Sequence, residues 1–257
     1  MTTATQTLER IRVGLDTAEI PRWATAAVLG AICAISLWLR SRVLGEGFWI
    51  DEGISVGIAH HHLTAIPHLL REDGSPPLYY LLLHFWIGWF GDGERATHVL
   101  SLIPALACIP VGYWTARALF GRTAGWVCAA LVAVDPYLTY YAQETRMYTL
   151  AALLSLVVTG AFVRGVVEGR RRFLPLLVIS LDTLLYTHNW GLFLCAGLAV
   201  ATICFARAHW REALFAGVAV VVVYAPWLPT LLYQAKHTGA PWALRPGFYA
   251  LVLAPGS

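Results

Sequence analysis

The sequence predicts an all-α fold, a polytopic transmembrane helical bundle with about seven crossings. Apolar residues make up 58% of the chain and charged residues only 13%, whereas about a quarter of the residues in a soluble domain are charged. Uncharged or nearly uncharged runs recur along the chain. A bilayer core takes about 20 apolar helical residues per crossing, so the 257 residues have room for roughly seven crossings and for no large soluble domain. We therefore expect a single transmembrane module over residues 1–257.

The apolar runs number eight, and one of them is unusually short. In chain order they cover residues 23–39, 75–90, 96–116, 123–141, 147–163, 173–187, 189–206 and 213–233. The run 75–90 opens with Pro76 and Pro77. At 1.5 Å per residue its helix spans about 24 Å, which is short of the hydrocarbon thickness. We expect this run to lie partly embedded without crossing, which leaves seven crossings.

The orientation follows from charge together with the positions of polar residues. With run 75–90 not crossing and a cytoplasmic N-terminus, 11 Lys and Arg lie inside and 7 outside. Charge alone does not decide the orientation, because a topology in which run 75–90 crosses and the N-terminus lies outside gives the same 11 to 7 bias. Only the first arrangement puts Asp51, Glu144 and His188 on one outer face, and polar groups next to hydrocarbon are expected to share a cavity. We therefore predict a first outer loop over residues 40–95 that carries interfacial helices.

Two stretches carry the charged residues that border these runs. Residues 48–53 read "FWIDEG", and the carboxylate of Asp51 fits either the N-cap of an amphipathic helix or a catalytic group. The stretch "YYAQETRMYTL" holds Glu144 and Arg146 between two uncharged runs. These two residues either neutralise one another in a tight turn or face a polar cavity.

Five motifs occur in one order along the chain: "FWIDEG", "SPPLYYLLLHFW", "ARALFGRTAGW", "YYAQETRMYTL" and "YTHNWG". Over about residues 20–240 the chain resembles the membrane glycosyltransferases of the GT-C superfamily, nearest the branch of protein O-mannosyltransferases and aminoarabinose lipid A transferases. The resemblance implies a polyprenyl-phosphate-linked sugar donor and a lipid, glycan or protein hydroxyl as acceptor. It also implies an enzyme of the cell envelope, located in a bacterial plasma membrane with its active site on the outer face. Relatives usually continue beyond the seventh crossing, so we expect this chain to lack the C-terminal part of the family.

The resemblance also implies roles for single residues. Asp51 matches the acidic first-loop motif and is expected to be the general base, with Glu52 orienting the loop or a ligand. A base is needed because a hydroxyl is a poor nucleophile until its proton is removed, and direct attack inverts the anomeric carbon. The leaving polyprenyl phosphate keeps its negative charge, so catalysis also needs cations directed at the phosphate.

The cations that hold the donor phosphate are predicted from how this chain departs from its relatives. Relatives often carry a lysine where Ser75 stands and an arginine where His98 stands. Arg95 lies three residues before His98 and hence on the same helix face. We expect Arg95, His98 and Arg146 to bind the phosphate. The second acidic motif and its cavity are assigned to Glu144, Tyr148 and His188.

Two other classes of function compete with an enzyme. Asp135, Asp182 and His84 lie inside apolar runs, which is also typical of a membrane transporter or lipid flippase. A catalytically silent membrane scaffold subunit is the third class. The enzyme is favoured because the polar clusters lie at one face and the hydropathy shows no inverted repeat. No cofactor is certain and a divalent metal ion stays open, while the absence of a basic stripe excludes nucleic acid as a partner.

Overall fold

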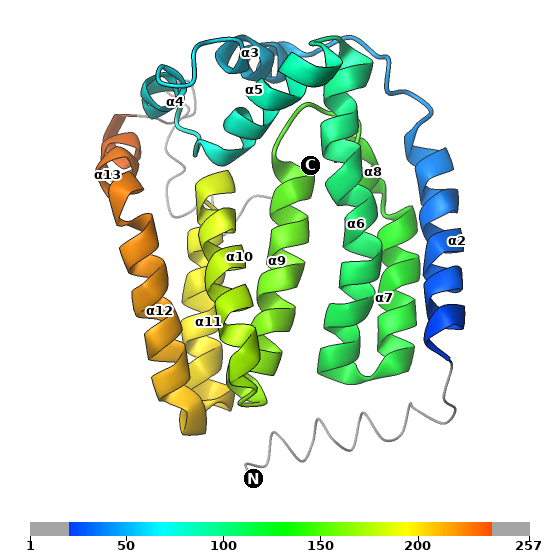
Figure 1. Ribbon diagram of the computed structural model, residues 1–257, viewed down its shortest axis with the longest axis vertical. Coiled ribbons are helices and arrows are strands. Elements are labelled where there is room, and N and C mark those ends of the chain that lie inside the picture. Colours follow the sequence, from blue (N-terminus) through cyan, green and yellow to red (C-terminus); the bar gives the residue numbers. More distant parts are fainter. Residues whose placement is uncertain (1–20, 238–257) are drawn as a thin grey trace, which may run out of the picture.

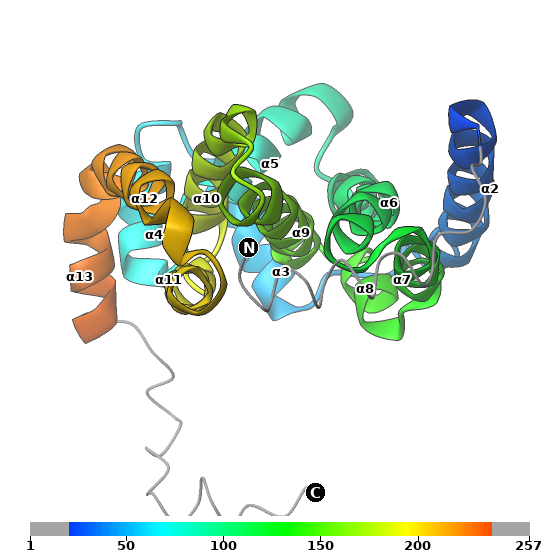
Figure 2. The ribbon, with the colours of Figure 1, turned by 90° about the horizontal axis from the view of Figure 1, so that it is seen from below.

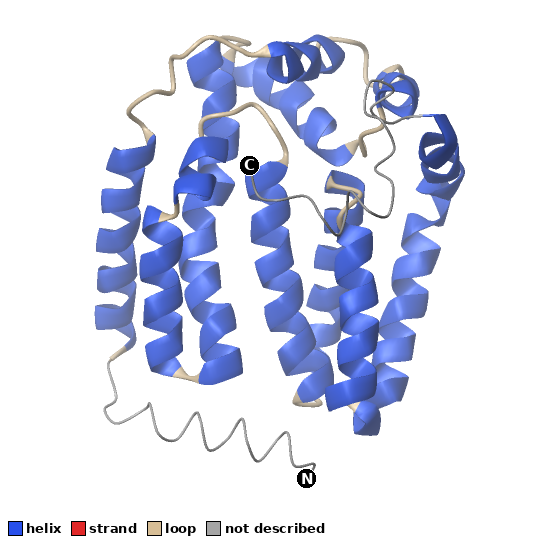
Figure 3. Ribbon diagram, turned by 180° about the vertical axis from the view of Figure 1, so that it is seen from behind, coloured by secondary structure: helices blue, strands red, loops and turns tan. Residues whose placement is uncertain are grey.

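The computed structural model describes residues 21–237, and this part of the chain is helical without any strand (Figure 3). Four helical stretches are long and apolar enough to cross a membrane: Arg22–Arg40, Glu94–Phe120, Tyr148–Val167 and Arg207–His237. Shorter apolar helices cover Leu78–Phe90, Arg122–Val134 and Gly191–Phe205. These helices are compatible with a multi-pass membrane protein, and the number of crossings stays a prediction.

The helices form an upright bundle with a helical cap at one end (Figure 1). The upright helices are α2 (Arg22–Arg40), α6 (Glu94–Phe120), α7 (Arg122–Val134), α9 (Tyr148–Phe162), α10 (Leu174–Thr187), α11 (Gly191–Phe205) and α12 (Trp210–Tyr224). The cap consists of α3 (Ile50–Ala59), α4 (Ile66–Asp73) and α5 (Leu78–Phe90). Helix α9 stands near the centre, where it packs against α6 on one side and α10 on the other (Figure 2).

Two predicted runs are divided by proline. Run 123–141 breaks into α7 and α8 (Pro136–Tyr141), because Pro136 has no N–H with which to continue α7. The Asp135 side chain caps α8 by accepting the Leu138 N–H at 2.7 Å. Run 213–233 contains α12, a short 3₁₀ turn (Ala225–Trp227) and the start of α13 (Leu228–His237). Further short turns are Val163–Val167, Arg171–Phe173 and Arg207–His209.

The last turn of α2 secures the break between α7 and α8. Pro136 leaves the carbonyl of Val132 without its helical donor. Arg40 fills that place, since its Nη2 donates to the Val132 carbonyl at 2.6 Å and its Nη1 to the Ala105 carbonyl at 2.9 Å. The guanidinium is completely buried, and burying a cation is costly unless its donors are satisfied. These two hydrogen bonds therefore attach α2 to both α6 and α7.

Helices α6 and α9 approach closely at a glycine. An added Cβ on Gly160 would lie 2.1 Å from Cζ3 of Trp114 and 2.8 Å from Oγ1 of Thr115. Small residues allow this close approach of helix backbones in membrane bundles. The contact sets the distance between α6 and α9, whose first turns both reach the cap.

Candidate functional site

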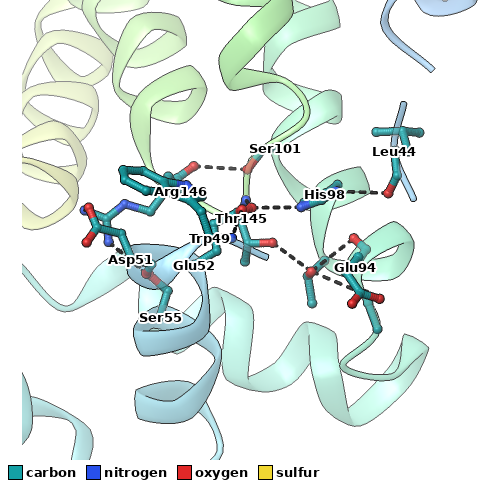
Figure 4. Close-up of polar contacts among 12 residues, drawn as sticks. Leu44, Trp49, Asp51, Glu52, Ser55, Glu94, His98, Ser101, Thr145 and Arg146 are labelled. Atoms are coloured by element: carbon teal, nitrogen blue, oxygen red, sulfur yellow. Dashed lines mark hydrogen bonds and ion pairs between the residues drawn. The ribbon is translucent and has the colours of Figure 1, made fainter. Parts of the chain in front are cut away.

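Polar side chains gather where the cap meets the bundle (Figure 4). They come from the first turns of α3, the first turns of α6 and the loop 142–147 that precedes α9. All three segments lie at the same end of the molecule (Figure 1). The clustering expected from the sequence is thus present for the residues around Asp51 and Glu144.

Glu52 holds three segments together and is enclosed, with only 3% of the residue exposed. Its Oε1 accepts hydrogen bonds from His98 Nε2 at 2.8 Å and from the Thr145 backbone N–H at 2.6 Å. Its Oε2 accepts the Trp49 N–H at 3.2 Å, which caps α3. Burial acts to raise the pKa of Glu52, but the hydrogen bonds from His98, Thr145 and Trp49 outweigh it and hold that pKa below its ordinary value. The carboxylate is therefore ionised at neutral pH.

His98 is 1% exposed, and both of its ring nitrogens have partners. Nδ1 lies 2.9 Å from the carbonyl oxygen of Leu44, and Nε2 lies 2.8 Å from Glu52 Oε1. A carbonyl oxygen and an ionised carboxylate can only accept, so each ring nitrogen must carry a hydrogen. His98 is therefore an imidazolium paired with Glu52, and no ring nitrogen is left for a phosphate.

The predicted phosphate residues do not share one place. Arg95 is exposed on the first turn of α6 and lines an apolar hollow beside Trp86 and Phe90. His98, three residues further on, is enclosed under the cap. The structure therefore does not bring Arg95 and His98 together around one ligand, whereas it places Arg146 beside Asp51.

Asp51 and Arg146 face one another at the edge of the cluster (Figure 4). Asp51 Oδ2 lies 4.0 Å from Arg146 Nη2, and the Asp51 side chain is 42% exposed. Arg146 Nη1 donates to Ser55 Oγ at 3.0 Å and more weakly to the Asp51 carbonyl at 3.4 Å. The Nε of Arg146 is buried without an acceptor among the described residues. Asp51 is not the N-cap of α3, because that position is Trp49 and the capping carboxylate belongs to Glu52.

Aromatic rings extend the cluster from Arg146 to the end of α10. The Arg146 guanidinium lies 5.6 Å from the centre of the Tyr148 ring, and the Tyr148 and His188 rings are 5.8 Å apart. Burial and the charge of Arg146 lower the pKa of His188, so the imidazole is neutral at pH 7. Its Nδ1 accepts the Trp190 N–H at 3.1 Å. His188 thus joins the cluster expected from the sequence.

Glu144 is the second enclosed carboxylate of the cluster, with 5% of the residue exposed. Burial raises its pKa and the nearby charge of Glu52 adds to this, while a hydrogen bond with Tyr140 and the charge of Arg146 oppose it. Its Oε2 has no hydrogen-bond partner among the described residues. The two buried carboxylates therefore differ, because Glu52 has its donors and Glu144 is incompletely satisfied.

An apolar groove lies directly below the cap. It encloses about 420 Å³ between α5, α6 and α9 and is lined by Tyr79, Leu82, Trp86, Ile103, Pro104 and Leu153 among others. Tyr79 Oη lies 3.1 Å from Ser101 Oγ, which donates to the Arg146 carbonyl at 3.0 Å. The Ser101 side chain therefore links the wall of the groove, at Tyr79, to the backbone of Arg146.

The residues that favoured a transporter have different surroundings. Asp135 caps α8, and His84 Nδ1 lies 2.7 Å from the Ala59 carbonyl oxygen at the end of α3. Asp182 is buried on α10, and neither carboxylate oxygen has a hydrogen-bond partner among residues 21–237. Two of the three residues thus have a local structural role, and Asp182 has none that these contacts reveal.

Several residues of the cluster were not expected from the sequence. Ser55 lies four residues after Asp51, and helix periodicity would have placed it on the same face. Thr145, Ser101 and the Leu44 carbonyl carried no signal, because the residues of the cluster that they contact lie 45 or more residues away in the chain.

Comparison with known proteins adds no relative. No protein family model matches the chain, and no curated protein matches it either. Between residues 21 and 237 no three His, Cys, Asp or Glu side chains are grouped to hold a metal ion. The functional argument therefore rests on the site itself.

Proposed function

We propose that this protein is a membrane glycosyltransferase with a GT-C-like fold. It moves a sugar from a polyprenyl-phosphate donor to a hydroxyl acceptor. One observation carries the proposal: an accessible carboxylate, Asp51, lies 4.0 Å from a mostly buried guanidinium, Arg146. The backbone carbonyl of Arg146 is linked through the Ser101 hydroxyl to Tyr79 in the wall of an apolar groove. A base, an anion-binding cation and a slot for a lipid chain are the three parts that such a reaction needs.

The reaction divides between the two side chains. Asp51 accepts the proton of the acceptor hydroxyl as the hydroxyl oxygen bonds to the anomeric carbon of the donor. The bond between that carbon and the phosphate oxygen breaks, and polyprenyl phosphate leaves with the electron pair, so the configuration inverts. Arg146 keeps its charge at every working pH, and a guanidinium offers parallel N–H donors to the oxygens of a phosphate. The phosphate role thus passes to Arg146 from Arg95 and His98.

The proposal includes a topology with seven crossings, a cytoplasmic N-terminus and the site on the outer face of a bacterial plasma membrane. The loops that join α6 to α7, α9 to α10 and α11 to α12 lie at the end opposite the cap (Figure 1). These loops and the adjoining helix ends hold Arg117, Arg122, Arg164, Arg170, Arg171, Arg172, Arg207 and Arg211. An excess of arginine marks the cytoplasmic side, which supports an outward-facing cap.

The test is sugar transfer by the purified full-length protein in lipid nanodiscs, supplied with radiolabelled polyprenyl-phosphate sugars. Asp51→Asn keeps the size of the side chain but removes its basic form, so turnover should fall about 100-fold or more while donor binding changes little. Glu46→Gln is the matched control, because Glu46 is an exposed carboxylate in the loop before α3. Near-normal turnover in Asp51→Asn would remove Asp51 from the reaction.

A membrane transporter or lipid flippase is the second candidate. The carboxylate of Asp182 favours it, because it is buried and has no hydrogen-bond partner among the residues that the structure describes. Ionisable side chains inside a membrane bundle mark ion or substrate pathways more often than structural sites. If none of the donors supports sugar transfer, the next experiment measures ion flux and lipid movement in proteoliposomes. A transporter or flippase should lose that activity when Asp182 is replaced. A protein without either activity would fit the scaffold subunit.

A further inference from the structure

The two residues of the proposed reaction are each one peptide bond from a buried contact. Asp51 precedes Glu52, and Arg146 follows Thr145. Glu52 Oε1 accepts the Thr145 N–H at 2.6 Å, whereas the direct contact between the side chains of Asp51 and Arg146 is 4.0 Å long and partly exposed. Arg146 also donates to Ser55 Oγ at 3.0 Å, but the Glu52–Thr145 contact is the shorter and the more enclosed of the two. It therefore contributes to how far apart Asp51 and Arg146 lie.

We propose that the buried ion pair of Glu52 and His98 positions Asp51 against Arg146. Both are positioning residues, since neither is open to a substrate. The pair joins α3 to α6 through its own contact of 2.8 Å, and each partner ties in one loop: Glu52 holds residues 142–147 and His98 holds the Leu44 carbonyl. The effect of the pair on catalysis rests on the proposed function, whereas its role in holding the three segments together does not.

The positive charge of His98 is part of this arrangement. A neutral imidazole has one N–H and one lone pair, so it would turn the lone pair toward either Leu44 or Glu52. Thr145 Oγ1 also donates to Thr97 Oγ1 at 2.7 Å, one residue before His98 on α6. The 142–147 loop is therefore attached to α6 directly, through this hydroxyl pair and the Ser101 bond to the Arg146 carbonyl, and indirectly, through Glu52.

Two isosteric replacements separate the two hydrogen bonds of His98. The amide nitrogen of glutamine lies near the position of Nε2, so His98→Gln retains a donor for Glu52 and loses the one for Leu44. The amide nitrogen of asparagine lies near Nδ1, so His98→Asn retains the donor for Leu44 and loses the one for Glu52. His84→Gln is the matched control, because His84 also ties α3 to a neighbouring helix through a backbone carbonyl. Unlike His98, it has no carboxylate partner among residues 21–237.

The experiment measures the position of the 142–147 region relative to α3, without relying on activity. Spin labels replace Gly57 and Tyr137 in the full chain, with the five native cysteines changed to alanine. Both sites are exposed, on α3 and on α8 just before the loop. Pulsed electron paramagnetic resonance then gives the distribution of the distance between them.

We expect a narrow distribution in the parent protein and in His84→Gln, a clearly broader one in His98→Asn and Glu52→Gln, and an intermediate one in His98→Gln. In sugar transfer, His98→Asn should lower turnover at least tenfold, since small misplacements of catalytic groups cost up to about 100-fold. An unchanged distribution in His98→Asn would overturn the proposal, whatever the activity. If His98→Asn broadens the distribution but the parent protein transfers no sugar, the positioning role is supported and the proposed glycosyltransferase function is refuted.

Discussion

Gly160→Ala tests the packing on which the site is built. The new methyl group would lie 2.1 Å and 2.7 Å from two ring carbons of Trp114 and 2.8 Å from Thr115 Oγ1. Carbon atoms normally pack about 3.5–4.0 Å apart, so roughly 1.5 Å of movement is required. The substitution therefore forces α9 away from α6 or turns the Trp114 ring out of its place.

Neither neighbour of Gly160 moves easily. The Arg164 guanidinium lies 4.0 Å over the Trp114 ring and its Nη2 donates to the Trp114 carbonyl at 3.1 Å. Thr115 Oγ1 donates to the Leu156 carbonyl at 2.8 Å. Overpacking of this kind costs about 3 kcal/mol at the upper end of its usual range, and the better helix propensity of alanine returns about 1 kcal/mol. We expect Gly160→Ala to lower the free energy of unfolding by about 2 kcal/mol.

The assay is unfolding of the full chain in mixed detergent micelles, followed by tryptophan fluorescence. Gly197→Ala is the control, because an added Cβ on α11 at that position meets no atom within 4 Å. It should leave the stability unchanged or raise it by up to about 1 kcal/mol. If Gly160→Ala is as stable as Gly197→Ala, α9 does not approach α6 as described and the placement of Arg146 fails with it.

Three further predictions concern the cap. Glu52→Gln leaves His98 buried without its counter-charge and should cost about 3 kcal/mol at pH 7. The pKa of Glu52 is lowered on folding, so its contribution to stability is complete above pH 4.5 and is lost as the pH falls through its pKa in the folded state. The difference in thermal midpoint between Glu52→Gln and the parent protein should therefore shrink in acid. The pKa of Glu144 is raised instead, so its destabilising effect grows as the pH rises through 4.5. Glu144→Gln should therefore raise the thermal midpoint at pH 8 but not at pH 4, as thermal scans at both pH values would show. Cysteines introduced at Asp73 and Gly93, in a cysteine-free background, should both react with an impermeant thiol reagent outside intact cells, and labelling of one alone would contradict a cap that does not cross.

Helical structure and apolar character could both be predicted from the sequence alone, because both properties are local. Each run of uncharged residues became a helix or a pair of helices, and the divided ones break beside a proline that any reader of the sequence can see. The short run 75–90 became α5, which lies with α3 and α4 across one end of the bundle (Figure 1). The grouping of Asp51 with Arg146 and His188 was also within reach, since polar residues that border apolar runs have few places to go.

The contacts that each polar residue makes depend on how the helices pack, and they could not be predicted from the sequence. Arg95 and His98 share a helix face in the sequence, yet the rotation of α6 exposes Arg95 and encloses His98. Adjacent carboxylates separate in the same way, because successive helical residues point about 100° apart and α3 turns Glu52 inward and Asp51 outward. Two of the three partners of Glu52, His98 and Thr145, lie 46 and 93 residues away along the chain, and no local pattern specifies them. The axial rotation of α3 and α6 is set by how the whole bundle packs, so it is a property of all the contacts together.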